Sequence, residues 1–278
     1  MISVVIPAHN ESAVIGRLLT GLLADAHPNE FDIVVVANGC TDHTAEVAAG
    51  FGDAVNVLSS PVPSKHAALR LGDAKAAGFP RLYVDADVEL STDGARALAD
   101  ALNEPGVLAV APRREMVLDR RPFAVRWYYE FWQDLPVVRE GLFGRGVIGV
   151  NAAGKERLGT VPDVMGDDLA ASVAFEPAQR RIVTGATVRV HAPRTSMDLV
   201  RRRTRSVTST EQLAQRTSAV DSARTTRADL LGVVRRRPAM ALRLPVFLGF
   251  TLMARRQAER RVAAADFTTW DRDESSRT

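Results

Sequence analysis

The chain has 278 residues, of which 46% are hydrophobic and 25% are charged. This is the composition of an ordinary soluble globular protein, and it excludes a collagen-like, disulfide-rich or globally disordered chain. The length allows one large domain or two small ones. Because Cys40 is the single cysteine, an intrachain disulfide and a cysteine-based zinc cluster are excluded as well.

The formal net charge of +3 results from a very uneven distribution. Residues 189–261 contain 17 Arg against 5 acidic residues, a balance of +12, and residues 262–278 carry −2. That leaves −7 for residues 1–188. A segment this basic usually meets phosphates, nucleic acid or an anionic membrane surface. Nucleic acid is not expected as a partner, because the sequence contains no known nucleic-acid-binding module.

The apolar run Ile2–Ile6 lacks the charged region and the cleavage site of a secretory signal. No stretch reaches the roughly 18 uncharged apolar residues that a spanning helix needs. We therefore expect a cytoplasmic protein. The apolar stretch 239–254 lies between arginine clusters, a pattern typical of an interfacial helix on anionic lipid. It favours a peripheral position on the inner face of the plasma membrane, although a core-packing helix with a charged outer face has the same pattern.

The first 110 residues alternate short β-branched runs with helical patterns. The predicted strands are Ile2–Ile6, Asp32–Ala37, Ala54–Leu58, Arg81–Asp85 and Val107–Ala111. The predicted helices are Ser12–Ala26, Thr44–Gly50, Ser64–Ala77 and Thr92–Leu102. This alternation predicts an α/β fold with a Rossmann-like, mostly parallel sheet flanked by helices. Ligands of such sheets bind at the carboxyl ends of the strands.

The second part of the chain reads differently. After Pro122 we expect a helix with one aromatic face, which either packs the core or stacks on a sugar. The remaining predictions are a glycine-rich loop over Gly141–Gly149, helices from Ala152 and Asp167, a hairpin over Arg181–Val190, and arginine-rich helices from Met197 onward. The composition changes near Pro193. We therefore expect a catalytic domain over 1–195, with halves 1–112 and 113–195, and a helical basic region over 196–278.

Polar residues follow the first two predicted strands. The first strand leads into Pro7-Ala8-His9-Asn10-Glu11, and the second leads into Asn38-Gly39-Cys40-Thr41-Asp42. Amide and carboxylate side chains at two such turns can hold a polar heterocycle and a ribose, and the helix starts favour phosphate. Ordinary helix capping is the alternative for each turn taken alone.

Two carboxylates follow the fourth predicted strand, in Asp85-Ala86-Asp87. Side chains at i and i+2 share one face of a strand, where two acids repel each other unless a cation separates them. Mg²⁺ is commonly bound by one or two carboxylates together with substrate phosphates. The triplet therefore predicts a metal that holds a diphosphate, with an Asx-capped turn as the alternative.

These motifs, together with Lys65, resemble family 2 glycosyltransferases, which have the GT-A fold and use a nucleotide-sugar donor. The resemblance implies that Asp87 is a ligand of Mg²⁺ or Mn²⁺. It implies nucleotide contacts from Pro7, Ala8, Asn10, Glu11, Asn38, Asp42, Lys65, Asp85 and Ala86. Asn38 departs from the family pattern, which commonly has an aspartate there, although an amide can also hydrogen-bond a ligand.

Further downstream, Gly166-Asp167-Asp168 resembles the Glu-Asp motif of the same family. The resemblance makes Asp168 the general base toward the acceptor hydroxyl, and Asp167 a residue that helps to place the acceptor. Helix capping by the two acids is the alternative. The resemblance also suggests His191 as a metal ligand. Arg202 and Arg205 would neutralise the leaving diphosphate.

The resemblance thus implies an inverting, metal-assisted transfer of a sugar from a donor, UDP- or GDP-linked, to a hydroxyl of a carbohydrate, lipid-linked or small-molecule acceptor. Such enzymes serve cell-envelope or polysaccharide biosynthesis. Two alternatives stay open from the residues alone. One is a haloacid-dehalogenase-like phosphatase with Asp85 as the nucleophile. The other is a non-catalytic scaffold that binds nucleotides or membranes.

Overall fold

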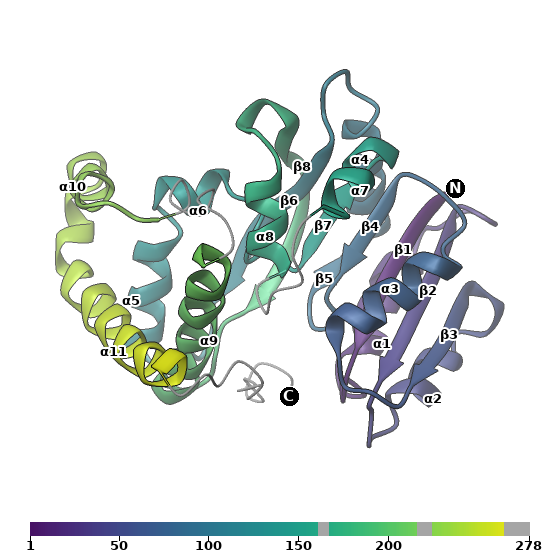
Figure 1. Ribbon diagram of the computed structural model, residues 1–278, viewed down its shortest axis with the longest axis horizontal. Helices are drawn as coiled ribbons and strands as arrows, with labels where there is room; N and C mark the ends of the chain where they lie inside the picture. The colour runs from purple at the N-terminus through teal and green to yellow at the C-terminus, as the bar shows by residue number, and fades with distance from the viewer. Residues whose placement is uncertain (161–166, 216–223, 264–278) are drawn as a thin grey trace.

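The computed structural model describes residues 1–160, 167–215 and 224–263, with the backbone alone at 167–168 and 261–263. These residues form an eight-stranded sheet with helices on both faces, in the strand order β3-β2-β1-β4-β7-β6-β8-β5 (Figure 1). The strands are β1 (Ile2–Ala8), β2 (Phe31–Asn38), β3 (Val55–Ser60), β4 (Arg81–Val84), β5 (Glu89–Leu90), β6 (Ala109–Val117), β7 (Val147–Val150) and β8 (Arg180–His191).

The first half of the sheet is parallel, as the strand and helix alternation predicts. β1 lies between β2 and β4 and pairs in parallel with both, and β2 pairs in parallel with β3. Alternate residues of β2 face opposite sides: Ile33 and Val35 join the core under α1, whereas Val34 and Val36 pack against Ala68 of α3. The carboxyl ends of β1, β2 and β4 therefore lie at one edge of the sheet.

The second half of the sheet is mixed, and two predictions there are wrong. The expected loop Gly141–Gly149 contains strand β7, which runs antiparallel to both β4 and β6. The glycines of this segment are the reason that its sequence does not predict a strand. A Cβ on Gly149 would lie 2.7 Å from the side chain of Leu82 and 2.8 Å from that of Val110. The neighbouring strands thus require glycine at a position where propensity argues against a strand.

The expected hairpin Arg181–Val190 is instead the single strand β8. β8 pairs in parallel with β6, and the register jumps so that Pro112 faces Val183 while Arg113 faces Thr187. Residues 184–186 therefore bulge from the ladder, and Gly185 marks this bulge rather than a chain reversal. The short strand β5, which pairs antiparallel to β8, has no counterpart in the prediction.

The helices form two layers and a C-terminal cluster. They are α1 (Ile15–Leu23), α2 (Thr44–Ala49), α3 (Lys65–Lys75), α4 (Thr92–Ala101), α5 (Phe123–Trp132), α6 (Pro136–Glu140), α7 (Ala152–Leu158), α8 (Asp167–Ala174), α9 (Ser196–Ala214), α10 (Arg227–Arg236) and α11 (Leu244–Ala263). Short 3₁₀ turns, η1 (Gly52–Ala54), η2 (Pro177–Gln179) and η4 (Pro238–Leu242), join some of them. Side-chain caps begin several helices, such as Ser64 at α3 and Asn151 at α7.

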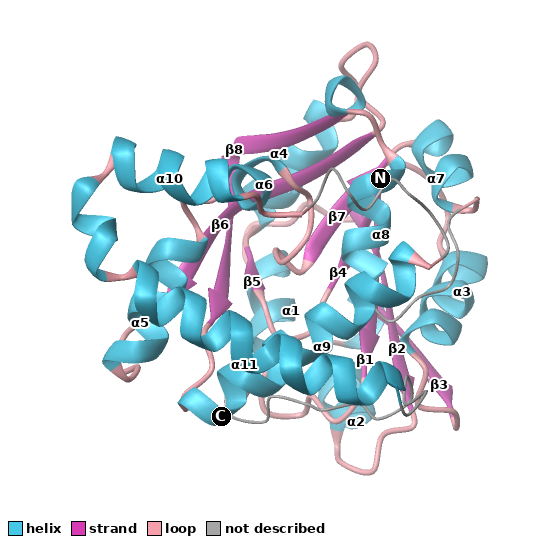
Figure 2. Cartoon of the chain, turned by 60° about the vertical axis from the view of Figure 1, so that its left-hand side comes forward, coloured by secondary structure: helices cyan, strands magenta, loops and turns pink. Residues whose placement is uncertain are grey.

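The aromatic face of α5 belongs to the core. Tyr128 and Phe131 are fully buried. The ring of Phe247, from α11, lies 5.3 Å from the Tyr128 ring and 4.9 Å from the Phe131 ring, centroid to centroid. Helices α9 and α11 lie side by side at the end of the molecule away from β3 (Figures 1 and 2). In the described parts of the chain, none of the helices has the length and apolar content that crossing a membrane requires.

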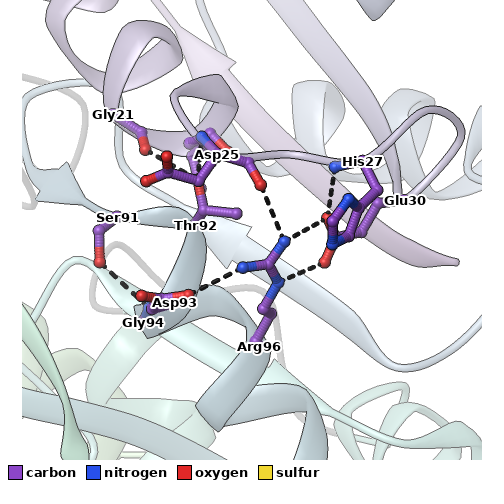
Figure 3. Close-up of polar contacts among 10 residues, drawn as sticks. Gly21, Asp25, His27, Glu30, Ser91, Thr92, Asp93, Gly94 and Arg96 are labelled. Carbon is purple, nitrogen blue, oxygen red and sulfur yellow. Dashed lines mark hydrogen bonds and ion pairs between the residues drawn. The ribbon is translucent and has the colours of Figure 1, made fainter.

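A polar cluster fastens α4 to the connection between α1 and β2 (Figure 3). The Arg96 guanidinium donates to both carboxylate oxygens of Glu30, at 2.6 and 2.8 Å, and to the carbonyl of Asp25 at 2.9 Å. Thr92, at the start of α4, donates to the carbonyl of Leu22 at 2.9 Å. One guanidinium therefore holds the end of α1, the start of β2 and the first turn of α4 together.

This cluster predicts an acid dependence of stability. The hydrogen bond from Arg96 and the backbone N–H of His27 lower the pKa of Glu30 from 4.5 to about 2. The stabilisation is therefore complete above pH 4.5 and is lost as the pH falls toward 2. Glu30→Gln should lower the melting temperature at pH 7, and the difference from the wild type should shrink between pH 4.5 and 2, as circular dichroism can measure. Glu156→Gln, at an exposed position of α7, is the matched control and should show a small difference that does not change with pH.

Candidate functional site

The turns that follow β1 and β2 interlock through side chains. The Asn38 side chain is buried, and its amide nitrogen donates to the carbonyl of Ala8 at 2.7 Å. The backbone N–H of Thr41 donates to the Asn10 side chain at 2.8 Å. Asn10 has a φ of +52°, a conformation that Asn tolerates better than most residues. The two predicted motifs, residues 7–11 and 38–42, thus lie together at the edge of the sheet. We call this surface the ledge.

Asp42 serves as a cap for two chain segments within this ledge. Its carboxylate accepts the N–H of Ser12 at 3.1 Å and both the N–H and the hydroxyl of Thr44, at 3.1 and 2.5 Å. Burial alone would raise the pKa of Asp42, but these hydrogen bonds outweigh burial and lower the pKa overall. Glu11 is also buried here, and its backbone N–H donates to the Thr44 hydroxyl at 2.7 Å. Asp42 therefore ties the turn before α1 to the first residue of α2.

Lys65 and Asp85, each expected from the resemblance to contact the nucleotide, form an ion pair here, which the sequence does not predict. Lys65 is the first residue of α3, and its Nζ lies 2.7 Å from Oδ1 of Asp85, directly after β4. The backbone N–H of Asp85 donates to the carbonyl of Gly146 at 2.7 Å. Gly146 has a φ of +67°, and a Cβ there would lie 2.5 Å from the side chain of Val88. The glycine-rich segment before β7 thus approaches the acidic triplet closely, which only glycine permits.

The other members of the triplet, and His191, occupy different surroundings. Ala86 is buried and Asp87 is half-buried. The Nε2 of His191 lies 2.7 Å from Glu89, so the ring pairs with the strand that follows the triplet. Burial would raise the pKa of Glu89, but His191, Arg17 and Arg189 outweigh it and lower that pKa. The predicted role of His191 as a metal ligand stays a prediction. The contact with Glu89 uses Nε2, so a metal would have to bind Nδ1, and ligating histidines commonly keep a carboxylate on the other ring nitrogen.

Asp85 and Asp87 are of the residue type that binds divalent cations, but they do not form a complete coordination shell by themselves. Among the described side chains, no three His, Cys, Asp or Glu residues are placed to hold a metal together. Mg²⁺ and related hard cations often take only one or two protein carboxylates and complete their coordination with water and substrate phosphates. Asp85 and Asp87 at the end of β4 offer that kind of incomplete donor set.

The remaining predicted residues lie on α8 and α9. Asp167 begins α8, as expected from the sequence. The side chains of Asp167 and Asp168 are outside the described part of the structure. Arg202 donates to the carbonyl of His191 at 3.2 Å, which places it beside the end of β8. Arg205 lies one turn further along α9.

A cavity of about 280 Å³ connects the acidic triplet with α8. Its walls come from the end of β1, from α3, from β4 and β7, and from α7 and α8. The lining residues are Pro7, Lys65, His66, Leu69, Arg70, Asp73, Tyr83, Val84, Asp85, Gly146, Val147, Ile148, Lys155, Leu158, Gly159, Ala170 and Ala171. Since Ala171 lies one turn after Asp168, the cavity extends from the predicted donor side to the helix of the predicted base.

Two polar clusters, each with a buried arginine, lie beside this cavity, and the sequence predicts neither. The Asp73 carboxylate, on α3, accepts from Arg81 at 2.8 Å, from the Tyr83 hydroxyl at 2.7 Å and from Lys155 of α7. Burial and the neighbouring Asp73 charge raise the pKa of Tyr83. This cluster fixes α3, and with it Lys65, against β4 and α7. An acid in a helix that also carries exposed charges gives no sequence signal for such a role.

Arg145 is the centre of the second cluster. Its guanidinium is buried and donates to the carbonyls of Gly141, Pro112, Val138 and Arg139 at 2.8 to 3.2 Å. A planar fork with five donors suits this task, which a lysine could not perform. The hydrogen bonds of Arg145 therefore fix the conformation of the glycine-rich segment beside Asp85. In the sequence, Arg145 looks like an ordinary charged loop residue.

Comparison with known proteins agrees with this geometry. Residues 3–157 match the sequence profile of Glycosyl transferase family 2. The mannosyltransferase PcManGT from Pyrobaculum calidifontis, solved with GDP-Man and Mn²⁺, superimposes with a TM-score of 0.62 at 18% identity, over 95% of this chain and 75% of that one. TarS 1–349 of Staphylococcus aureus, solved with UDP-GlcNAc, gives a TM-score of 0.51 at 15% identity, over 96% and 76%.

A curated relative matches a shorter stretch. The 4,4'-diaponeurosporenoate glycosyltransferase of Staphylococcus aureus (strain USA300) is 33% identical over 119 residues, which is 40% of this chain and 31% of that protein. The sheet and its flanking helices therefore have the GT-A fold. Because the profile covers more than half of the sequence, the chain belongs to glycosyl transferase family 2.

Proposed function

We propose that the protein transfers a sugar from a nucleotide-sugar donor to a hydroxyl acceptor with inversion at the anomeric carbon, assisted by Mg²⁺ or Mn²⁺. The observation that carries this proposal is the cavity that joins the Lys65–Asp85 pair to α8. It gives a sugar a place between the residues that would hold the diphosphate and the helix that would carry the base.

The donor is proposed to be UDP- or GDP-linked. Support comes from the neighbours of similar fold that contain GDP-Man and UDP-GlcNAc. The ledge after β1 and β2 would receive the nucleoside through Pro7, Ala8, Asn10, Glu11, Asn38 and Asp42. Within it, Asn38 would offer its side-chain oxygen to the ligand, because its amide nitrogen already donates to Ala8.

The end of β4 would hold the diphosphate. Asp87 would be the principal protein ligand of the cation, and Asp85 would reach the ribose or the sugar. When bound, the cation would neutralise the negative charge that develops on the departing diphosphate. Lys65, now paired with Asp85, would turn to the phosphates, and Arg202 and Arg205 would approach them from α9. Guanidinium groups suit phosphate oxygens because of their planar donor geometry.

Asp168 would accept the proton of the acceptor hydroxyl while that oxygen attacks the anomeric carbon. The bond from this carbon to the phosphate oxygen breaks in the same step, and the nucleoside diphosphate leaves with the bonding electrons. Asp167 would help to place the acceptor. We propose a carbohydrate, a lipid-linked molecule or a small molecule as the acceptor, in cell-envelope or polysaccharide biosynthesis. One relative is named as a 4,4'-diaponeurosporenoate glycosyltransferase.

The two alternative functions have less support. A phosphatase that uses Asp85 as its nucleophile would be expected to carry that residue after the first strand, whereas here it follows β4. Such a phosphatase would also give no role to the ledge after β1 and β2. A non-catalytic scaffold would bind the donor without turning it over, which the experiment below distinguishes.

Thermal shift with a panel of nucleotide sugars tests the proposal. A ligand present at about 100 times its dissociation constant stabilises the folded state by about 2.7 kcal/mol, which corresponds to roughly 5 °C or more in a chain of this size. We expect such a rise with one or more UDP- or GDP-sugars, and only when MnCl₂ or MgCl₂ is present. Donor hydrolysis or transfer in the same samples separates an enzyme from a scaffold. If UDP-, GDP-, dTDP- and CMP-sugars all leave the melting temperature unchanged, the proposal is wrong.

A further inference from the structure

One side of helix α11 is exposed in the described part of the structure, and that side is apolar over the first half of the helix. The opposite side packs against α9 and α5 and buries Phe247, Ala254 and Ala258. On the uncovered side Leu248 and Leu252, one turn apart, have exposed fractions of 37% and 53%. Large aliphatic side chains in a row on a solvent-facing helix are typical of an interaction surface rather than of ordinary surface composition.

The same side becomes basic in the second half of the helix. Arg255, Arg256 and Arg260 are exposed, with Glu259 the one acidic residue between them. We define the α11 face by its apolar and basic members together. It consists of Leu242 in η4, of Leu248, Leu252 and Met253, and of Arg255, Arg256 and Arg260. Leu242 and Met253 are 71% and 49% exposed.

Arginines in this region fall into two groups. One group is paired with acidic residues: Arg237 pairs with Asp134, just after α5, at 2.6 Å, and Arg243 pairs with Glu130 of α5. Within the described part of the chain, the three arginines of the α11 face form no ion pair with an acidic residue. These arginines are exposed, and along α11 they follow the exposed Leu248 and Leu252.

We propose that the α11 face binds an anionic lipid bilayer. The leucines and the methionine would enter the boundary between headgroups and acyl chains, and the arginines would contact the lipid phosphates. An apolar surface beside clustered arginines is the pattern that peripheral membrane helices use. Each basic residue near an anionic membrane adds about 1 kcal/mol, which is about fivefold in affinity. A nucleic acid would use the arginines but would give no role to four exposed aliphatic side chains.

Co-sedimentation of the full chain with large unilamellar vesicles tests this surface. With 30% phosphatidylglycerol in phosphatidylcholine we expect binding, and with pure phosphatidylcholine at least about tenfold less. Leu248→Glu/Leu252→Glu and Arg255→Glu/Arg256→Glu should each reduce the partition coefficient about tenfold or more. Leu71→Glu and Lys75→Glu, at exposed positions of α3, are the matched controls and should bind like the wild type. Circular dichroism checks that every variant is folded.

A second measurement does not depend on charge reversal. In a Cys40→Ala background, a polarity-sensitive fluorophore on Leu252→Cys should shift to the blue when phosphatidylglycerol vesicles are added, whereas the same label on Leu71→Cys should not. The proposal is overturned if vesicle binding is equal for the wild type and both α11 double variants. It is also overturned if the wild type binds neither kind of vesicle and the only effect of the leucine variants is to convert a dimer of this chain into monomers.

Membrane binding is independent of the chemistry proposed above. Asp87→Asn should bind vesicles like the wild type whether or not it transfers a sugar. A wild type that binds nucleotide sugar but no vesicles would contradict the membrane surface alone, and the reverse would contradict the donor proposal alone.

Discussion

Asp168→Asn is expected to reduce the rate of sugar transfer by about 10²- to 10⁴-fold, which is the usual contribution of a general base. Donor affinity should stay within about twofold of the wild type, because the substitution removes a proton acceptor and leaves the nucleotide ledge unchanged. Single-turnover kinetics with a saturating donor, together with calorimetric titration of the nucleoside diphosphate, measures both quantities.

The same variant separates catalysis from helix capping. Asp168 is the second residue of α8, so a purely structural Asp168 would act on the helix dipole. Its replacement would then cost about 0.3–1 kcal/mol of stability and leave transfer unchanged. Asp229→Asn, which changes another acid in the first turn of a helix, is the matched control and should leave transfer unchanged. Transfer by Asp168→Asn at the wild-type rate would show that the base lies elsewhere.

Asp87→Asn is expected to weaken Mn²⁺ binding in the presence of nucleoside diphosphate by about 10-fold or more and to lower transfer by about 10²-fold or more. The physical reason is the loss of a carboxylate from a site that has few protein ligands. Charge stabilisation by a metal contributes several kcal/mol to such reactions. Electron paramagnetic resonance of free and bound Mn²⁺ reports the affinity directly.

Two further variants sharpen that result. Asp100→Asn, at an exposed position of α4, controls for the loss of one negative charge and should keep the affinity for Mn²⁺. His191→Ala distinguishes two roles of the histidine. An unchanged Mn²⁺ affinity would mean that His191 serves Glu89, to which its ring is bonded here, and a tenfold loss would support the predicted role as a ligand. A wild-type Mn²⁺ affinity in Asp87→Asn would contradict the assignment of that carboxylate.

The parallel half of the fold could be predicted because local and tertiary preferences agree there. β1 and β2 are β-branched and buried on both faces, so their pattern alone identifies them. β7 could not be predicted, because Gly149 is required by the side chains of Leu82 and Val110, which are distant in sequence. The bulge in β8 is equally non-local, since it depends on the register with β6.

For the site, sequence predicts which residues gather but not what each one bonds to. The motifs after β1, β2 and β4 do meet at one edge, because parallel strands bring their carboxyl ends together. The inward hydrogen bond of Asn38 and the double cap by Asp42 become visible only in three dimensions. Asp73 and Arg145 were missed for the same reason: their roles depend entirely on partners that tertiary structure brings to them.

The stacking of Phe247 on Tyr128 and Phe131 has a consequence for protein engineering. A chain that stopped at residue 195 would keep every predicted catalytic side chain except Arg202 and Arg205, yet it would expose two aromatic rings that are now fully buried. Aromatic side chains of this size bury about 150–250 Å² each. The catalytic part therefore depends on the arginine-rich helices for its solubility, and exchanging these helices between relatives would require an aromatic residue in the same place.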